Sequence, residues 1–328
     1  MRHTHHWDLG AHTVRSAVNA GGTRAAEQDA ALRRLASNIV LGAALLLIAA
    51  KLWGWMMTDS VSLLTSAADA VVDALAAAAT FFGVRFAQRP ADSMHRYGHG
   101  KGEALAAFTQ AILLAGAAVM LAAQSLWRLV YPQPLTAIGL GLCVAAGGVA
   151  ISSLLAAMQS WIVRRTGSTA IAADRTHYLM DAALNAAVLA ALALTGVTGW
   201  QRVDPAFALG IAGYMIVAAR RVALTASRQL LDHELPLELR ERIEQTAVAC
   251  RGVQAIHDLR TRDAGDRMFV EFHLEVDGHV SVEEGHDIVD AAESAIAALF
   301  PKQTEVIGHV EPAGIKDLRL DDRVRLTE

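Results

Sequence analysis

SAADAVVD at residues 66–73 and DRTHYLMD at residues 174–181 are the two stretches of this chain that decide its fold. Each lies inside an apolar run that is long enough to cross a bilayer as one helix. Each also contains two polar side chains spaced four residues apart, so that the pair shares one helical face. Because a charged side chain near the centre of a bilayer costs at least about 2.5–3.5 kcal/mol, these groups need a compensating partner there.

The polar pairs are Asp69 with Asp73 and His177 with Asp181. Together they form a four-ligand set of nitrogen and oxygen donors of the kind that zinc accepts. Metal and protons compete for such a set, because bound metal requires ionised acids and a neutral imidazole. The alternative is a polar stripe that faces other helices, with its acids hydrogen-bonded. The first interpretation predicts a site where a divalent cation and protons are exchanged.

The composition is typical of a membrane protein. Of 328 residues, 53% are hydrophobic, and the mean hydropathy is +0.31. Cys143 lies in an apolar run and Cys250 in the polar C-terminal part, so we expect neither a disulfide framework nor a thiolate zinc cluster.

The chain contains six apolar runs, each near the roughly 20 residues that a bilayer requires. They are predicted as spanning helices at 36–57, 61–87, 104–130, 136–163, 169–194 and 204–226.

Basic residues gather in alternate connections between these runs, whereas the opposite loops are poor in them. The positive-inside rule therefore predicts that both termini are cytoplasmic. The residues on the basic side are Arg24, Arg33 and Arg34 before the first run, Arg85, Arg89, Arg96 and Lys101 after the second, Arg164 and Arg165 after the fourth, and Arg220, Arg221 and Arg228 at the sixth.

Four segments follow from these changes in composition. Residues 1–34 are polar and are expected to form a flexible tail, or else a weak metal-collecting arm. Residues 35–231 hold the six spanning helices. Charges become dense from about residue 232, so residues 232–313 are expected to form a cytoplasmic domain and 314–328 a loose tail. The histidines of the first segment are His3, His5, His6 and His12.

The cytoplasmic domain is expected to follow the order α-β-β-α-β. Ala264-Gly265-Asp266 is typical of a hairpin turn between two alternating strands. Ser281 and Glu284 have the spacing of a capping box, which marks the start of the second helix. The predicted elements are a helix at 236–250, strands at 255–262 and 267–277, a helix at 281–299 and a strand at 304–310.

Two further groups of side chains could bind metal. The first comprises Asp92, His95 and His99 in the loop between the second and third runs; the alternative is a solvated loop with scattered polar residues. The second lies in the cytoplasmic domain, where ordinary surface histidines are the alternative. Its members are His257, His273, His286, His309 and Glu311.

These motifs together resemble the cation diffusion facilitator family, and within it the bacterial zinc/iron efflux antiporters. The motifs are the two spanning stripes, the loop HRYGHGK at residues 95–101 and HDLRTR at residues 257–262, and the resemblance covers about residues 30–312. It implies an α-helical membrane protein with six transmembrane helices plus a C-terminal cytoplasmic α+β domain, metallochaperone-like in its α-β-β-α-β order. It also implies a homodimer in the bacterial inner membrane that exchanges Zn²⁺ for protons, with Cd²⁺ and Fe²⁺ as further candidate cargo.

The resemblance also implies roles for particular residues. The two polar pairs become the transport site, Asp92 with the two loop histidines a loop site, and the four histidines of the cytoplasmic domain a binuclear site. Lys101 and Asp232 match a charge interlock between the third helix and the end of the sixth at the dimer contact. One departure is visible: the family's last strand often reads His-x-Asp-Pro, whereas this chain has His309-Val310-Glu311-Pro312.

Two other classes of function remain as alternatives. An intramembrane metalloenzyme would need a nucleophile or general base beside the metal, and the stripes offer only hydroxyls and Asn185 beyond the ligands. A membrane-anchored metal sensor would leave the intramembrane ligands unexplained. For the leading hypothesis, a secondary active transporter, the expected partners are lipid, divalent metal ions, protons and a second copy of the chain, with no organic cofactor and no nucleic acid.

Overall fold

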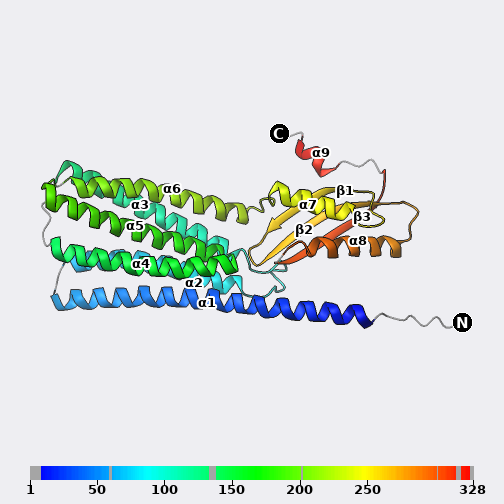
Figure 1. Ribbon diagram of the computed structural model, residues 1–328, viewed down its shortest axis with the longest axis horizontal. Helices are drawn as coiled ribbons and strands as arrows, with labels where there is room; N and C mark the ends of the chain where they lie inside the picture. The colour runs from blue at the N-terminus through cyan, green and yellow to red at the C-terminus, as the bar shows by residue number, and fades with distance from the viewer. Residues whose placement is uncertain are drawn as a thin grey trace. The chain divides into compact units, whose positions relative to one another are not determined.

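A computed structural model describes residues 9–58, 61–132, 138–200, 202–300, 302–314 and 319–325; the side chains of 9–26, 61–69 and some further helical residues lie outside this description. Its six long helices are each long and apolar enough to cross a membrane, which confirms the predicted fold class (Figure 1). They are α1 (Leu9–Thr58), α2 (Val61–Ala87), α3 (Gly102–Val130), α4 (Ile138–Thr166), α5 (Thr169–Thr198) and α6 (Val203–Leu230).

The first helix starts earlier than the apolar run that it contains. α1 begins at Leu9, within the segment expected to be a tail, and its N-terminal part is rich in alanine, the strongest helix former. His3, His5 and His6 lie outside the described residues. His12 belongs to α1, but its side chain lies outside the description.

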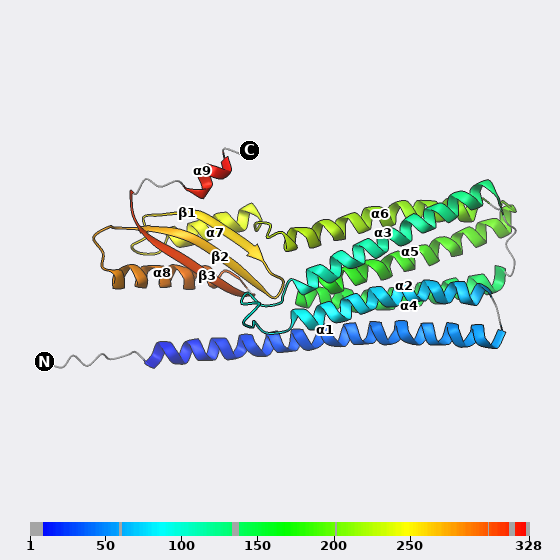
Figure 2. The same cartoon turned by 180° about the vertical axis from the view of Figure 1, so that it is seen from behind.

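Small side chains let the spanning helices approach closely, as is usual between membrane helices. One cluster joins Val40 and Ala44 of α1 to Ala77 of α2, with Tyr178 of α5 packed against it. A second cluster joins α3, α5 and α6, and Met180 is its member from α5. Helix α5 therefore contributes to both clusters: it packs with α1 and α2 in one and with α3 and α6 in the other (Figure 2).

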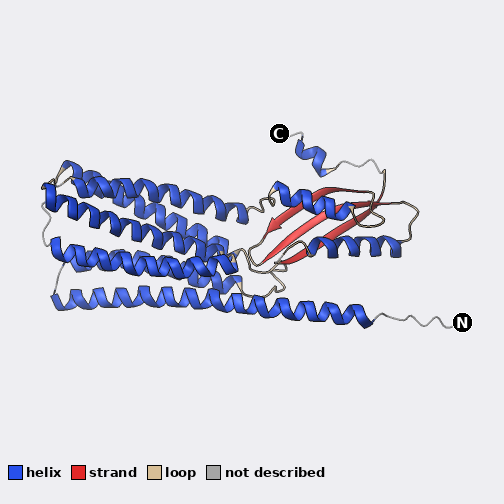
Figure 3. Ribbon diagram, viewed as in Figure 1, coloured by secondary structure: helices blue, strands red, loops and turns tan. Residues whose placement is uncertain are grey.

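The C-terminal unit is built on one three-stranded sheet (Figure 3). β1 and β2 are antiparallel, and β2 and β3 are parallel, with a helix as the crossover between them. The predicted order α-β-β-α-β is confirmed, and a short helix, α9 (Leu320–Arg325), lies beyond it. The elements are α7 (Leu237–Val248), β1 (Ala255–Asp263), β2 (Arg267–Val276), α8 (Val282–Ala297) and β3 (Gln303–Pro312).

The core of this unit lies on one face of the sheet only. Val270, Phe272 and Leu274 alternate along β2 and pack with Ile243 of α7 and Ile296 of α8. Because successive strand residues point to opposite faces, the residues between them, His273 included, belong to the other face. The sheet thus has one apolar face under the helices and one face that is polar apart from the buried Phe269.

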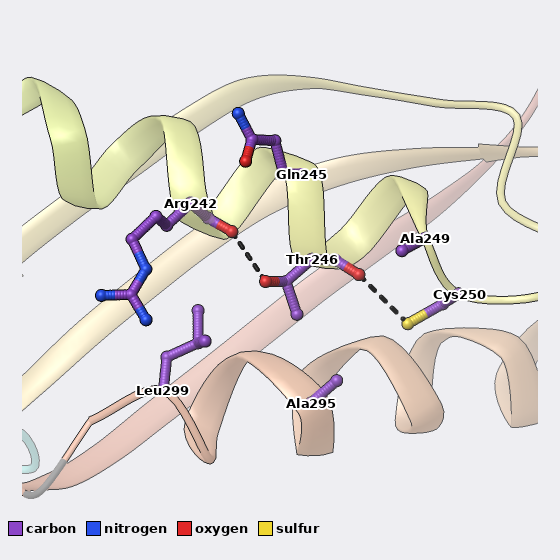
Figure 4. A pocket seen from close by; sticks show the side chains of 7 residues that line it. All are labelled: Arg242, Gln245, Thr246, Ala249, Cys250, Ala295 and Leu299. Carbon is purple, nitrogen blue, oxygen red and sulfur yellow. Dashed lines mark hydrogen bonds between the residues drawn. The ribbon is translucent and has the colours of Figure 1, made fainter.

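Helices α7 and α8 leave an open pocket between them (Figure 4). Thr246 and Cys250 line it from the α7 side, and Ala295 and Leu299 from the α8 side. The thiol of Cys250 donates a weak hydrogen bond to the carbonyl of Thr246. Cys143 and Cys250 are both free.

Candidate metal sites

The stripes of α2 and α5 meet at His177. Its Nε2 lies 3.4 Å from Oδ1 of Asp73 on α2 and 3.5 Å from Oδ2 of Asp181, one turn further along α5. Zinc bonds of about 2.0–2.1 Å in a tetrahedron separate neighbouring ligand atoms by about 3.4 Å. The separations between the imidazole nitrogen and the two carboxylates therefore match an edge of a zinc tetrahedron.

Three of the four predicted ligands of the transport site are thus brought together. The fourth, Asp69, lies on α2 one turn before Asp73, but its side chain is outside the described residues. Within the described part of the chain, no Lys or Arg forms an ion pair with Asp73 or Asp181. A cation between the carboxylates would supply the missing positive charge.

The loop group also converges. Nδ1 of His95 lies 3.3 Å from Oδ1 of Asp92, and Nε2 of His99 lies 3.4 Å from Oδ2 of the same carboxylate. The other ring nitrogen of His99 is 3.1 Å from the carbonyl oxygen of Pro90, which can only accept, so Nδ1 carries the proton. Nε2 then presents a lone pair toward Asp92, and a hydrogen-bonded Nδ1 is the usual support of a metal-binding histidine. These residues fit a metal.

The loop is shaped by Asp92 itself. Its Oδ1 accepts hydrogen bonds from the backbone N–H groups of Met94 (2.9 Å) and His95 (2.7 Å). These donors hold the pKa of Asp92 below its usual range, with the N–H of His95 as the largest cause. The carboxylate is consequently ionised at neutral pH, as a metal ligand must be.

The end of this loop packs against the β1–β2 hairpin. Gly100 approaches so closely that a Cβ there would collide with the carbonyl of Ala264 and the carboxylate of Asp266. The next residue, Lys101, forms an ion pair of 2.8 Å with Asp232. The second carboxylate oxygen of Asp232 lies 3.6 Å from Nη1 of Arg262 on β1. Asp232 therefore forms ion pairs with both Lys101 and Arg262.

Three histidines form a row across the polar face of the sheet. The register pairs His257 of β1 with His273 of β2, and His273 with His309 of β3. The ring centroids are 5.2 Å and 5.0 Å apart along this row. The fold therefore gathers three of the histidines that the sequence singles out.

Glu311 completes this cluster, which we call the histidine row. Its Oε1 lies 2.7 Å from Nδ1 of His273 and 3.6 Å from Nε2 of His309, and its Oε2 lies 3.3 Å from Nε2 of His257. His257 is buried, and neither of its ring nitrogens makes a hydrogen bond with any residue that the structure describes. An imidazole left without hydrogen bonds beside a carboxylate is costly unless another partner binds it. The donor set fits a metal ion.

His286 is not brought into the histidine row. It is exposed on α8, and its described contact is with Asp290 at 3.8 Å. The physical reason is the layer order, because α8 packs on the apolar face of the sheet and the histidine row lies on the polar face.

Two acidic residues beside the row were not predicted. Asp258 follows His257 at a β-bulge with φ 52°, which turns its side chain toward the same group. A bulge breaks the alternation from which strand faces are predicted, so period-two alternation does not place Asp258 on this face. Glu275, by contrast, is two residues after His273 on the same face, and Nε2 of His257 lies 3.7 Å from its Oε1. Period-two alternation could have found it.

Two models of known protein families match this chain. A family model described as the cation efflux transmembrane domain matches residues 38–231, and one described as the cation efflux protein cytoplasmic domain matches residues 235–313. The chain belongs to the cation efflux family. It is thus a multi-pass membrane protein of a transporter family and not a catalytic enzyme, and the predicted resemblance is confirmed.

Two relatives are similar over most of their length. The cation-efflux pump FieF of Klebsiella pneumoniae is 39% identical over 275 residues, which cover 84% of this chain and 90% of the relative. FieF of Escherichia coli is 38% identical over 285 residues, covering 86% and 94%. A solved structure of CzrB, described as a candidate zinc transporter in its Zn form, is 43% identical over 26% of this chain and 99% of that chain, with a TM-score of 0.24.

Proposed function

We propose that this cation efflux protein is a secondary active antiporter that exports Zn²⁺ from the cytoplasm in exchange for protons. The observation that carries the proposal is the meeting of Asp73, His177 and Asp181 at separations that suit zinc bonds. Asp69 completes the set by its place one turn before Asp73. Zn²⁺ is the substrate here, and protons compete with it for the same donors.

The cycle follows from that competition. Zn²⁺ enters the deprotonated site from the cytoplasm, the helices rock so that the site faces the other side, and protons displace the metal. The inward proton gradient then returns the carrier. One imidazole with three carboxylates suits Zn²⁺ and Cd²⁺, whereas Fe²⁺, Co²⁺ and Mn²⁺ accept similar donors, so site geometry sets the preference.

The location and assembly belong to the same proposal. The basic connections place both termini in the cytoplasm of a bacterial cell, with the protein in the inner membrane. Residues 35–231 form the transport domain and 232–313 the cytoplasmic domain; the flanking segments 1–34 and 314–328 include the first part of α1 and the short helix α9. The working form is a homodimer, with Lys101 and Asp232 close to the contact between copies. FieF is named as a cation-efflux pump, which supports export as the direction of transport.

The loop site and the histidine row bind metal as regulators in this proposal. Asp92, His95 and His99 would hold one ion, and His257, His273, His309 and Glu311 would hold the metal of the cytoplasmic domain. Bound metal supplies positive charge where several carboxylates gather, which lowers the repulsion between two acidic domains. Metal at these positions would therefore tighten the dimer without taking part in translocation.

Transport by purified protein in proteoliposomes tests the proposal. An imposed pH gradient should drive Zn²⁺ uptake in the wild type, and Asp73→Ala should abolish it while the protein stays folded. Asp204→Ala, an acid of α6 outside the stripe, is the matched control and should transport normally. Zn²⁺ flux at the wild-type rate in Asp73→Ala would show that Asp73 is not part of the transport site. Zn²⁺ uptake that does not depend on the pH gradient would show that the protein is not a proton antiporter.

A further inference from the structure

A buried carboxylate lies one turn before His177 on α5. Asp174 is 1% exposed, and both of its oxygens accept hydrogen bonds from side-chain amides. Oδ1 accepts a hydrogen bond of 3.0 Å from Nε2 of Gln110 on α3, and Oδ2 accepts one from Nε2 of Gln159 on α4. A polar group is costly to bury unless it is hydrogen-bonded, and here both carboxylate oxygens have a side-chain donor.

The same network reaches the other half of the transport site. Nε2 of Gln110 also contacts the carbonyl oxygen of Ala76 at 3.1 Å and the hydroxyl of Thr80, both on α2. Thr80 is two turns after Asp73 and therefore on the same helical face. Gln110 is 4% exposed and Thr80 1% exposed, so water does not compete for these contacts. One amide thus ties α2 and α5 together beside the transport ligands.

Rotation of α5 matters for the transport site. Asp174, His177 and Asp181 follow a 3-4 spacing, so a contact that fixes the first fixes the direction of the other two. With side chains about 5–6 Å from the helix axis, a turn of about 10° moves their tips by about 1 Å. Metal–ligand distances tolerate only about 0.2 Å. The site needs a directional contact that holds the helix angle.

The apolar contacts of α5 are less directional than hydrogen bonds. Its buried apolar side chains include Ala170, Ala173, Ala187 and Ala191 together with the larger Ile171, Met180 and Leu192. Van der Waals contacts of this kind allow close approach, but their energy depends only weakly on the contact angle. Hydrogen bonds weaken steeply with angle, so the two amides on Asp174 can fix the rotation of α5.

We propose that Asp174 is a positioning residue of the transport site, which it aligns through Gln110 and Gln159 without binding Zn²⁺ itself. This inference rests on the proposed function, because it concerns the same site. Asp174 acts in this role through its two oriented hydrogen bonds and not through its negative charge. Asparagine at this position can keep both. Oε1 of Gln159 has no hydrogen-bond partner among the described residues, so the Gln159 amide can turn and accept from the amide of the new asparagine.

The test compares four variants of the full-length protein in proteoliposomes. Asp174→Ala leaves two buried amide donors without an acceptor, so it should raise the KM for Zn²⁺ at least tenfold. Gln159→Met, of similar volume, should raise the KM in the same direction, which keeps the test open if Asp174→Ala does not fold. Asp174→Asn should stay within about threefold of wild type with an unchanged pH profile. Ser152→Ala, another buried polar residue of α4, is the control and should change nothing.

Equilibrium Zn²⁺ binding, measured by calorimetry on the purified protein, gives a readout besides transport. The Zn²⁺ ion whose binding is lost in Asp73→Ala is the one bound at the transport site. The affinity of that site for Zn²⁺ should fall at least tenfold in Asp174→Ala and little in Asp174→Asn. If Asp174→Asn is as impaired as Asp174→Ala, the carboxylate acts through its charge and the inference is overturned. Wild-type KM in both Asp174→Ala and Gln159→Met would overturn it too, whereas wild-type flux in Asp73→Ala would instead reject the proposed function.

Discussion

Nδ1 of His273 donates a hydrogen bond of 2.7 Å to Oε1 of Glu311, across the parallel pair of strands β2 and β3. The longer side chain of Glu311 thus reaches the neighbouring strand, where the family's pattern often has aspartate. The same carboxylate also lies within 3.6 Å of His309, its neighbour two residues earlier on β3. Glu311 is therefore the acid that links the histidine row.

Replacement of this acid should weaken the metal response of the cytoplasmic domain. Glu311→Gln keeps the size of the side chain but removes the charge, so we expect Zn²⁺ binding to the histidine row to weaken at least tenfold. Spin labels on the cytoplasmic domains of the full-length dimer should approach each other on Zn²⁺ addition in the wild type and respond much less in the variant. His286→Ala, outside the row, is the control. An equal response in Glu311→Gln would show that the row is not the regulatory site.

The histidine row also shows how far the sequence could predict this site. Period-two alternation places His273 and Glu275 on one face, but it does not say which residue of the next strand lies beside them. The register that aligns His257, His273 and His309 depends on the strand pairing and on the bulge at Asp258. Individual ligands were therefore predictable, and their arrangement was not.

The spanning helices were more predictable, for a physical reason. A bilayer fixes both the length and the apolar character of a spanning segment, so six runs could be located without tertiary information. Helical spacing then placed Asp73 on one stripe and His177 with Asp181 on another. Asp174 lies three residues before His177 on the same helical face, but the sequence indicates no role for it, because its partners Gln110 and Gln159 come from helices that only the fold brings together.

Removal of the buried loop histidine should abolish the loop site. His99 is 5% exposed, and its ring packs edge-on against Phe86 at 4.8 Å, so the ring is held in place before any metal binds. We expect His99→Ala to lower the Zn²⁺ stoichiometry of the purified protein by one equivalent. Met94→Ala is the control, since Met94 is exposed in the same loop. Unchanged stoichiometry in His99→Ala would leave Asp92 and His95 as part of an ordinary solvated loop.

Arg262 should matter more for stability than Lys101, although both pair with Asp232. The Lys101 pair is partly exposed, so its loss in Lys101→Met should cost less than about 1 kcal/mol. Arg262 also stacks over the rings of Tyr97 at 4.4 Å and Phe269 at 4.6 Å, and each such contact adds about 0.5–1 kcal/mol. Thermal unfolding should therefore rank Arg262→Ala as the less stable variant. Arg262→Lys keeps the charge but loses the planar stack, and it should fall between.

The capping box of α8 predicts a pH-dependent contribution to stability. The carboxylate of Glu284 accepts from the backbone N–H of Ser281 (2.9 Å) and from its hydroxyl (3.1 Å), and these bonds lower the pKa of Glu284. The stabilisation is thus present above the ordinary pKa of 4.5 and is lost as the pH falls through the lower folded value. Glu284→Gln should unfold at a lower temperature than wild type at pH 7, and the difference should shrink toward pH 4. A constant difference would assign the effect to shape and not to charge.

The metal preference of the transport site should depend on its single imidazole. His177→Asp would leave an all-carboxylate set with Asp73 and Asp181, and such sets suit harder ions than the borderline imidazole does. We expect the variant to gain Mn²⁺ transport relative to Zn²⁺, measured as competition between the two ions for uptake into proteoliposomes. His286→Asp makes the same exchange on the exposed face of α8, so it should keep the wild-type preference. If His177→Asp keeps that preference as well, selectivity is set elsewhere, and His177 serves only to hold the two carboxylates in place.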